Sequence, residues 1–356
     1  MTDQPTAELL EKMVREAEPV RKLDITGASL RGRILAGGTF EQVNFEGADL
    51  TGADLRECVF INCRFDQSIL NRARCNDGIW HACTLEGVQM RGSNWARTNL
   101  AESTFDWVDF SGSSLKETGL VRCKLTDCRF SDAHVELTSF LECALDSANF
   151  SDTRMNRPVL YKCDLRSACF DRASMWMGAL VEANLAGLDL TGLDLHQTQF
   201  TGADLTGVNL SAANLSQCNF QNACLNEARL DEARAENALF INANLERASL
   251  RDAILDQALF TECKAEGADF TGARASMSQW QRADCRNARL VNMRLDYADF
   301  SNADLSGADL RGSELERCNL HAVRDDESNI PDRSRTLRTD PERLRAERWK
   351  AASRTP

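Results

Sequence analysis

Two segments of the sequence decide the fold: FEGADLTGADL at residues 45–55 and FTGADLTGVNL at residues 200–210. In both, a large apolar residue recurs every five positions, and the residue two positions before each Leu is the small residue Ala, except for Val208 before Leu210. The same phase runs from Ile25 to Leu320 without insertion or deletion, over 60 positions that include 31 Leu and all 16 Phe of the chain. Such an internal repeat determines the architecture before any local motif does.

A period of five fits neither a helix of 3.6 residues per turn nor a simple two-residue strand pattern. A short extended segment followed by a turn does fit. In an extended segment, residues two apart face the same way, so the small and the large residue both point inward. Gly is common two positions after the large residue, where it permits turn conformations, and the frequent Asp or Asn can hydrogen-bond backbone donors at the bend. Each pentad therefore predicts one side of a coil.

The number of sides follows from columns of aromatic residues. Phe110, Phe130, Phe150 and Phe170 are spaced by 20 residues, and the same spacing recurs within residues 200–260. Twenty residues correspond to four pentads, so each coil has four sides, and identical rings would stack between coils. The sequence thus predicts an all-β solenoid of about 15 coils of 20 residues.

This pattern resembles the pentapeptide-repeat family, and it covers residues 23–322. The resemblance implies the fold of that family, a right-handed quadrilateral β-helix. Residues 1–22 and 323–356 would lie outside the repeat as terminal segments.

Both ends carry helical signals. Apolar residues recur at helical spacing in TAELLEKMVREAE, residues 6–18, which predicts an N-terminal helical cap within residues 1–22. After Val323 the pentads stop, and a charged tail, residues 323–356, begins. The run Thr339-Asp340-Pro341-Glu342 has the form of a capping box and predicts a short C-terminal helix. The tail could fold back over the last coil, or it could dock a partner through Leu344 and Trp349.

Composition and charge exclude several functions. The net charge of −12 disfavours direct binding to nucleic acid or to an anionic membrane. No long apolar stretch and no secretory signal is present, so we expect a cytoplasmic protein. The 14 Cys are then expected to be reduced, and most of them occupy the small inward position, where Cys packs like Ala.

Catalytic signals are missing from the sequence. The four His belong to no zinc or nucleophile motif, and the Gly residues form no phosphate-binding loop. We therefore predict no catalytic, metal or cofactor-binding residues, and a protein that is not an enzyme.

One feature of the outward positions suggests binding. Val121, Leu141, Tyr161 and Val181 follow one another at spacings of 20, which predicts an apolar ladder on one side. Exposed apolar patches that contain Tyr and Trp commonly mark interaction surfaces. The predicted partner-binding patch adds residues of the same side and of the neighbouring side, around the corner: Val159, Leu137, Trp176 and Met177. It could be covered by the tail, by a second copy in a homodimer or by a heterologous protein.

Two functions remain after these exclusions. The preferred one is a protein-interaction scaffold or adaptor. Residues 8–20 and 23–28 resemble pentapeptide proteins that accompany bacterial type VI secretion spike proteins, which implies an accessory role with a spike or effector component as partner. The alternative is an acidic rod that mimics DNA and binds a type II topoisomerase such as DNA gyrase, as some family members do. Its charge density is well below that of a DNA duplex.

Overall fold

The computed structural model describes residues 7–349, so residues 1–6 and 350–356 of the two predicted terminal segments lie outside the described residues. Within this range there are two helices, α1 (Ala7–Arg15) and α2 (Pro341–Arg348), and neither is long and apolar enough to cross a membrane. Eleven short strands lie between them. They are β1 (Val20–Arg21), β2 (Thr39–Glu41), β3 (Val59–Ile61), β4 (Ile79–His81), β5 (Asn99–Ala101), β6 (Gly119–Val121), β7 (His134–Glu136), β8 (Ser139–Leu141), β9 (Arg154–Asn156), β10 (Val159–Tyr161) and β11 (Ser174–Trp176).

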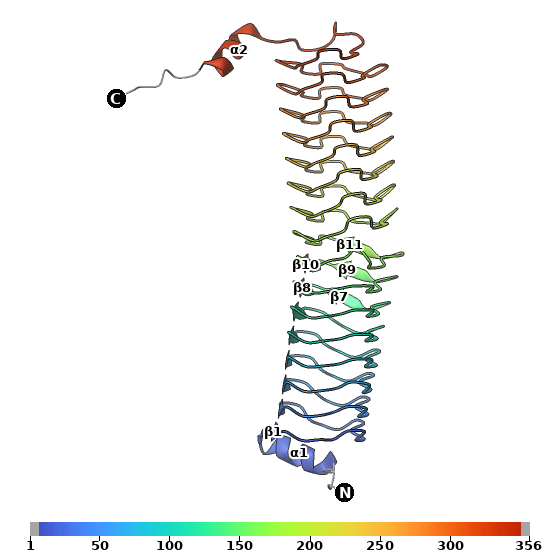
Figure 1. Ribbon diagram of the computed structural model, residues 1–356, viewed down its shortest axis with the longest axis vertical. Helices are drawn as coiled ribbons and strands as arrows, with labels where there is room; N and C mark the ends of the chain where they lie inside the picture. Colours follow the sequence, from blue (N-terminus) through green and yellow to red (C-terminus); the bar gives the residue numbers. More distant parts are fainter. Residues whose placement is uncertain (1–6, 350–356) are drawn as a thin grey trace, which may run out of the picture. The chain divides into compact units, whose positions relative to one another are not determined.

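The chain divides into two compact units, Met1–Asp204 and Leu205–Pro356. In the first unit, eight strands form a parallel sheet in the order β1-β2-β3-β4-β5-β6-β8-β10, and β11-β9-β7 form a second parallel sheet. Partners lie 20 residues apart, as in Val59↔Ile79. In the second unit, parallel bridges keep the same separation, from Asn209↔Arg229 to Asp309↔Asn329. Each unit is therefore a stack of 20-residue coils, visible in Figure 1, and the predicted parallel β-solenoid is confirmed.

Nearly every pentad turns at a residue with left-handed backbone. At Gly52, φ is +66° and the amide donates to the carbonyl of Asn71 in the next coil, at 2.9 Å. Gly adopts this conformation without strain, whereas other corners use residues such as Asp77, at φ +64°. The Asp or Asn before the large residue hydrogen-bonds the bend as expected: the Asp49 carboxylate accepts from the amide of Thr51 at 3.0 Å.

The predicted aromatic columns form the core of the coils. In the first unit, the Phe110, Phe130, Phe150 and Phe170 rings are stacked, with centroids 4.7 to 5.2 Å apart. In the second unit, the stack runs from Phe220 through Phe240, Phe260 and Trp280 to Phe300. Nearly all other inward side chains are fully buried. Because each coil contacts only its neighbours, stability accumulates coil by coil.

The predicted N-terminal helix is present as α1, which lies against the first coil (Figure 1). Its Leu10 is fully buried, and the Glu11 carboxylate accepts from the amide of Ile34 at 3.0 Å and pairs with Arg33 at 3.2 Å. The helix ends in a Schellman motif with Ala17 at φ +56°. These contacts cover the open edge of the first coil, as an exposed strand edge requires.

The C-terminal end differs from the sequence expectation in two details. Backbone pairing continues past Val323, with Asn329 paired to Asp309 and Leu337 to Asn319, although the side-chain consensus ends, because the pairing uses only main-chain groups. The N-cap of α2 is Asp340, whose carboxylate accepts from the amides of Glu342 and Arg343 at 2.8 and 3.2 Å. The capping box headed by Thr339 is therefore wrong in this detail. The Thr339 hydroxyl instead accepts from an amide of the last coil.

Candidate protein-interaction surface

The predicted apolar ladder is assembled on one side of the first unit. Val121, Leu141 and Tyr161 are in register on β6, β8 and β10. Val181 continues the column, because its carbonyl accepts from the amide of Lys162, the residue after Tyr161, at 3.1 Å. Val159 lies on the same side, two residues before Tyr161 on β10. All five side chains are partly exposed.

The side that carries this ladder has no formally charged outward residue over eight coils. From Val59 to Thr201, its outward positions hold no Asp, Glu, Lys or Arg, and we name them the uncharged side. They are Val59, Ile61, Ile79, His81, Asn99, Ala101, Gly119, Val121, Ser139, Leu141, Val159, Tyr161, Ala179, Val181, Gln199 and Thr201. The other sides carry ion pairs such as Arg64 with Asp66 at 2.6 Å. Sequence reasoning found the ladder but missed this wider property, which appears when the outward positions are aligned at a spacing of 20.

The corner residues of the predicted patch form a separate group. Trp176 ends β11 on the neighbouring side, in register with Asn156, and its indole N–H donates to the Asn156 side-chain oxygen. Leu137 and Met177 lie at the corner between the two sides, and Arg157 occupies the same corner one coil from each. Leu137, Trp176 and Met177 are each 42 to 43% exposed. The patch therefore does turn the corner, but a guanidinium interrupts it there.

Trp176 also lines a shallow groove on its own side. The groove has a volume of about 180 Å³ and includes Arg154, Met155 and Glu136 among its walls. The indole ring lies 6.2 Å from the His196 ring. Trp176 can thus contribute to binding on two sides of the coil.

A column of alternating charge borders the uncharged side. It consists of Glu102, Arg122, Glu142, Lys162 and Glu182, each at the corner after the ladder. Arg122 donates to Glu102 at 2.6 Å, which lowers the pKa of Glu102 and raises that of Arg122. Lys162 pairs with Glu182 at 3.4 Å, and its ammonium lies 5.1 Å from the centroid of the Tyr161 ring. We name these five residues the charged column.

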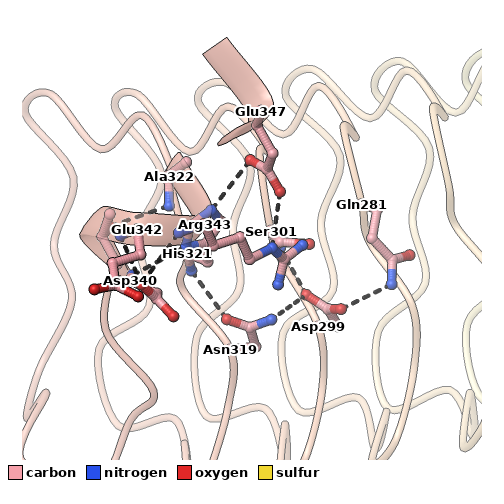
Figure 2. Close-up of polar contacts among 11 residues, drawn as sticks. Gln281, Asp299, Ser301, Asn319, His321, Ala322, Asp340, Glu342, Arg343 and Glu347 are labelled. Carbon is pink, nitrogen blue, oxygen red and sulfur yellow. Dashed lines mark hydrogen bonds and ion pairs between the residues drawn. The ribbon is translucent and has the colours of Figure 1, made fainter. Parts of the chain in front are cut away.

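The tail contacts the last coil mainly through polar groups (Figure 2). His321 is 1% exposed, its Nε2 lies 3.1 Å from the Glu347 carboxylate, and its Nδ1 accepts from the amide of Asp340 at 3.1 Å. Of the two predicted docking residues, Leu344 is partly exposed and Trp349 is 74% exposed. Sequence reasoning missed His321, because a single His outside any motif carries no signal for a packing contact.

Twelve of the 14 thiols occupy inward positions, most of them the small position as predicted, whereas Cys169 and Cys224 lie outward, and none of the 14 forms a disulfide in the structure. Cys123, Cys143 and Cys163 each donate to a backbone carbonyl of the preceding coil at 3.4 Å. Burial raises the pKa of Cys163 to about 11 and that of Cys58 to about 12, so these thiols stay protonated at neutral pH. Among residues 7–349, no cluster of three or more His, Cys, Asp or Glu side chains could hold a metal ion.

An enclosed apolar cavity of about 10 Å³ in the first unit is lined by residues that include Met175 and Leu193. It is too small and too apolar for a cofactor.

Comparison with known proteins agrees with this architecture. A family model described as a pentapeptide repeat region matches residues 34–110. A second model, pentapeptide repeats (8 copies), matches residues 123–157, 180–217, 213–252, 238–274 and 283–321. No curated protein matches the chain.

Several solved structures are similar to parts of the chain. Full-length QnrB1, a plasmid-mediated fluoroquinolone resistance protein, is 17% identical, and the match covers 59% of this chain and 92% of QnrB1 with a TM-score of 0.26. HetL of the cyanobacterium Nostoc sp. strain PCC 7120 is 19% identical, with 88% and 96% covered and a TM-score of 0.16. At these values the matches indicate no function. The family-model matches span more than half of the sequence, so the chain belongs to the pentapeptide-repeat family.

Proposed function

We propose that this protein is a non-catalytic protein-interaction scaffold whose contact surface is the ladder of Val121, Leu141, Tyr161 and Val181. The observation that carries the proposal is the register of these four side chains on a side without formal charge. Burying such a surface removes apolar area from water and leaves no unpaired charge behind. Tyr161 and the nearby Trp176 supply the aromatic groups that dominate many protein interfaces.

A more specific role as a type VI secretion accessory or effector-loading protein rests on the resemblance of the N-terminal residues alone. Under that proposal, the ladder would contact a spike or effector component, and the protein would act in the bacterial cytoplasm. The contacts of α1 with the first coil explain how this helix caps the solenoid, and they do not bear on the accessory role.

The DNA-mimic alternative has weaker support. A mimic of duplex DNA needs rows of unneutralised negative charge. Here many carboxylates pair with guanidinium groups one coil away, as in Arg97 with Asp77 at 2.6 Å and Arg172 with Asp152 at 2.6 Å. These pairs reduce the acidic potential of the sides that would face a topoisomerase.

The proposal is tested with a variant that places charge on the patch, Tyr161→Arg combined with Trp176→Arg. Both side chains are exposed in part, so we expect the coils to remain folded. The matched control is Ser111→Arg combined with Ser131→Arg, which adds the same charge to another side of the same unit. Each tagged protein is purified from its native cells, and co-purifying proteins are identified by mass spectrometry.

A partner that is lost from the patch variant and retained by the control supports the scaffold. Secretion components among the lost partners support the accessory role. Topoisomerase subunits that all three proteins retain would support the DNA mimic instead. Partners that do not differ between the patch variant and the control would contradict the proposed surface.

A further inference from the structure

The charged column and the ladder share one centre of symmetry. Read along the coils, the ladder runs Val121, Leu141, Tyr161, Val181, which is small, large, large, small. Its midpoint lies between the coils of Leu141 and Tyr161. The bordering charges at the same four coils are Arg122, Glu142, Lys162 and Glu182. Reversing their order about the same midpoint places every charge opposite its complement.

We infer that the ladder binds a second copy of this chain, in an antiparallel arrangement related by a two-fold axis that runs along the strands between the coils of Leu141 and Tyr161. The inference rests on the proposed function, because it names the partner of the same surface. A two-fold axis in this direction brings each column against the same column of the second copy, in reverse order.

The apolar contacts follow directly from this operation. Leu141 faces Tyr161 of the second copy, and Val121 faces Val181. In the neighbouring column of the same side, two residues before the ladder, Gly119 faces Ala179 of the second copy. Two flat strand faces of this kind pack at about 10 Å, the usual spacing between sheets.

The charged contacts select this arrangement. Arg122 faces Glu182 of the second copy, and Glu142 faces Lys162, so four opposite-charge pairs border the interface. Within one copy, Arg122 already pairs with Glu102 and Lys162 with Glu182, and the second copy extends each pair into a longer alternating row. Exposed pairs contribute little free energy, but like charges at the same places would oppose association and set the register.

The other symmetric arrangement matches fewer residues of the charged column. A two-fold axis along the coil stack would bring that column against the opposite corner, where Arg122 would meet Glu117 and Glu102 would meet Arg97 of the second copy. Lys162, however, would meet Arg157, and Glu142 and Glu182 would meet the uncharged Leu137 and Met177. The other three sides of the first unit are less suited to self-association. Two copies with a net charge of −12 each repel, and each of those sides carries outward carboxylates.

The size of the surface predicts a weak dimer. Six coils centred on the axis span about 25 Å at the usual strand spacing, and one side is about 10 Å wide. With its borders, the contact buries on the order of 800 Å² over both copies, which is below the standard range for stable complexes. We therefore expect a monomer–dimer equilibrium at micromolar concentrations, in which the dimer covers the ladder.

The test uses charge reversal with complementation. Glu142→Lys and Lys162→Glu each create two like-charge pairs in the dimer, and each is expected to weaken self-association about tenfold in analytical ultracentrifugation between about 5 and 500 μM. A mixture of the two variants restores both pairs in a heterodimer, so association should recover to within about threefold of the native protein. Misfolding of either variant cannot produce this recovery. Matched controls on another side, Glu86→Lys and Lys124→Glu, should leave association unchanged.

Cross-linking fixes the direction of the two copies. In a background of Cys169→Ser and Cys224→Ser, which removes the two thiols that are not fully buried, a short bismaleimide should link Val121→Cys to Val181→Cys in a mixture. Each single variant alone should cross-link far less. Links between Val121→Cys and Gly119→Cys would indicate the parallel arrangement and overturn the inference.

A native protein that stays monomeric at all these concentrations, or a mixture that shows no recovery, would also overturn the inference. The proposed scaffold function is tested independently of the dimer. A monomeric protein whose partner is lost from the Tyr161→Arg and Trp176→Arg variant keeps the scaffold and refutes the dimer.

Discussion

The indole N–H of Trp280 donates to the hydroxyl of Ser278, two residues earlier on the same side, at 2.7 Å. Trp95 and Ser93 repeat this relationship at 2.7 Å in the first unit. Trp80 has Gly78 at the corresponding position, and its buried indole N–H has no hydrogen-bond partner. The small inward position therefore has a second role at Trp95 and Trp280, where a hydroxyl satisfies a donor that the core would otherwise bury unpaired.

Ser278→Ala is expected to lower the free energy of unfolding of the second unit by about 1 to 3 kcal/mol, because it leaves a buried donor unsatisfied. Urea denaturation followed by far-ultraviolet circular dichroism measures this change. In a Trp280→Phe background, the same substitution should cost less. An equal cost in both backgrounds would show that the hydroxyl does not act through the indole.

Leu210 is fully buried at the centre of a pentad. Leu210→Ala should destabilise the second unit by about 2 to 5 kcal/mol through the cavity that it leaves, and Leu210→Arg by more, because it buries an unpaired charge. Gln221→Arg, at an outward position of the same unit, should change stability by less than about 0.5 kcal/mol. Similar midpoints of thermal unfolding for Leu210→Arg and Gln221→Arg would contradict the inward and outward assignment.

Acid should weaken the first unit through Asp54, whose side chain is 4% exposed and pairs with Arg56 at 2.7 Å and Arg74 at 2.9 Å. Hydrogen bonding from Arg56, which outweighs burial, lowers the pKa of Asp54. The folded state thus binds this proton less readily than the unfolded state does. Its contribution to stability is complete above the unfolded pKa of about 3.9, and it is lost as pH falls through the lower folded pKa.

The native protein should therefore lose stability below about pH 4 more steeply than Asp54→Asn does. The check is urea denaturation at pH 7, 4 and 3, with Asp132→Asn, an exposed carboxyl, as the control. A constant difference between the native protein and Asp54→Asn at all three pH values would contradict the role of this pair.

His321 joins the last coil to α2, so His321→Ala should release the helix without unfolding the coils. We expect protection of the amides of residues 344–348 from hydrogen exchange to fall about tenfold, while amides of the core coils keep their protection. Thr261→Ala, on the same side of the second unit, serves as the control. Unchanged protection of α2 in His321→Ala would show that other contacts hold the tail.

The columns of the sequence predicted most of the fold, because inward residues must match those of the next coil 20 positions away. The Phe stacks and the ladder from Val121 to Val181 follow from this rule. The continuation of the backbone pairing to Leu337 could not be predicted in the same way, since it proceeds without the side-chain pattern.

The candidate surface was only partly predictable for a similar reason. Alignment at 20 residues located the ladder and Trp176, and the same alignment places Arg157 between Leu137 and Met177, which sequence reasoning overlooked. The N-cap at Asp340 and the contact of His321 with Glu347 arise from how the tail returns to the last coil. No local pattern encodes that return.

The most direct measurement of the central claim is photo-cross-linking in native cells, with p-benzoylphenylalanine in place of Tyr161 and, as the control, in place of Ser131 on another side. The scaffold predicts a cross-linked protein adduct at position 161 and none at position 131, and the mass of the adduct distinguishes a second copy from another partner. Adducts of equal yield at both positions, or none at position 161, would contradict the claim that the uncharged side is the contact surface.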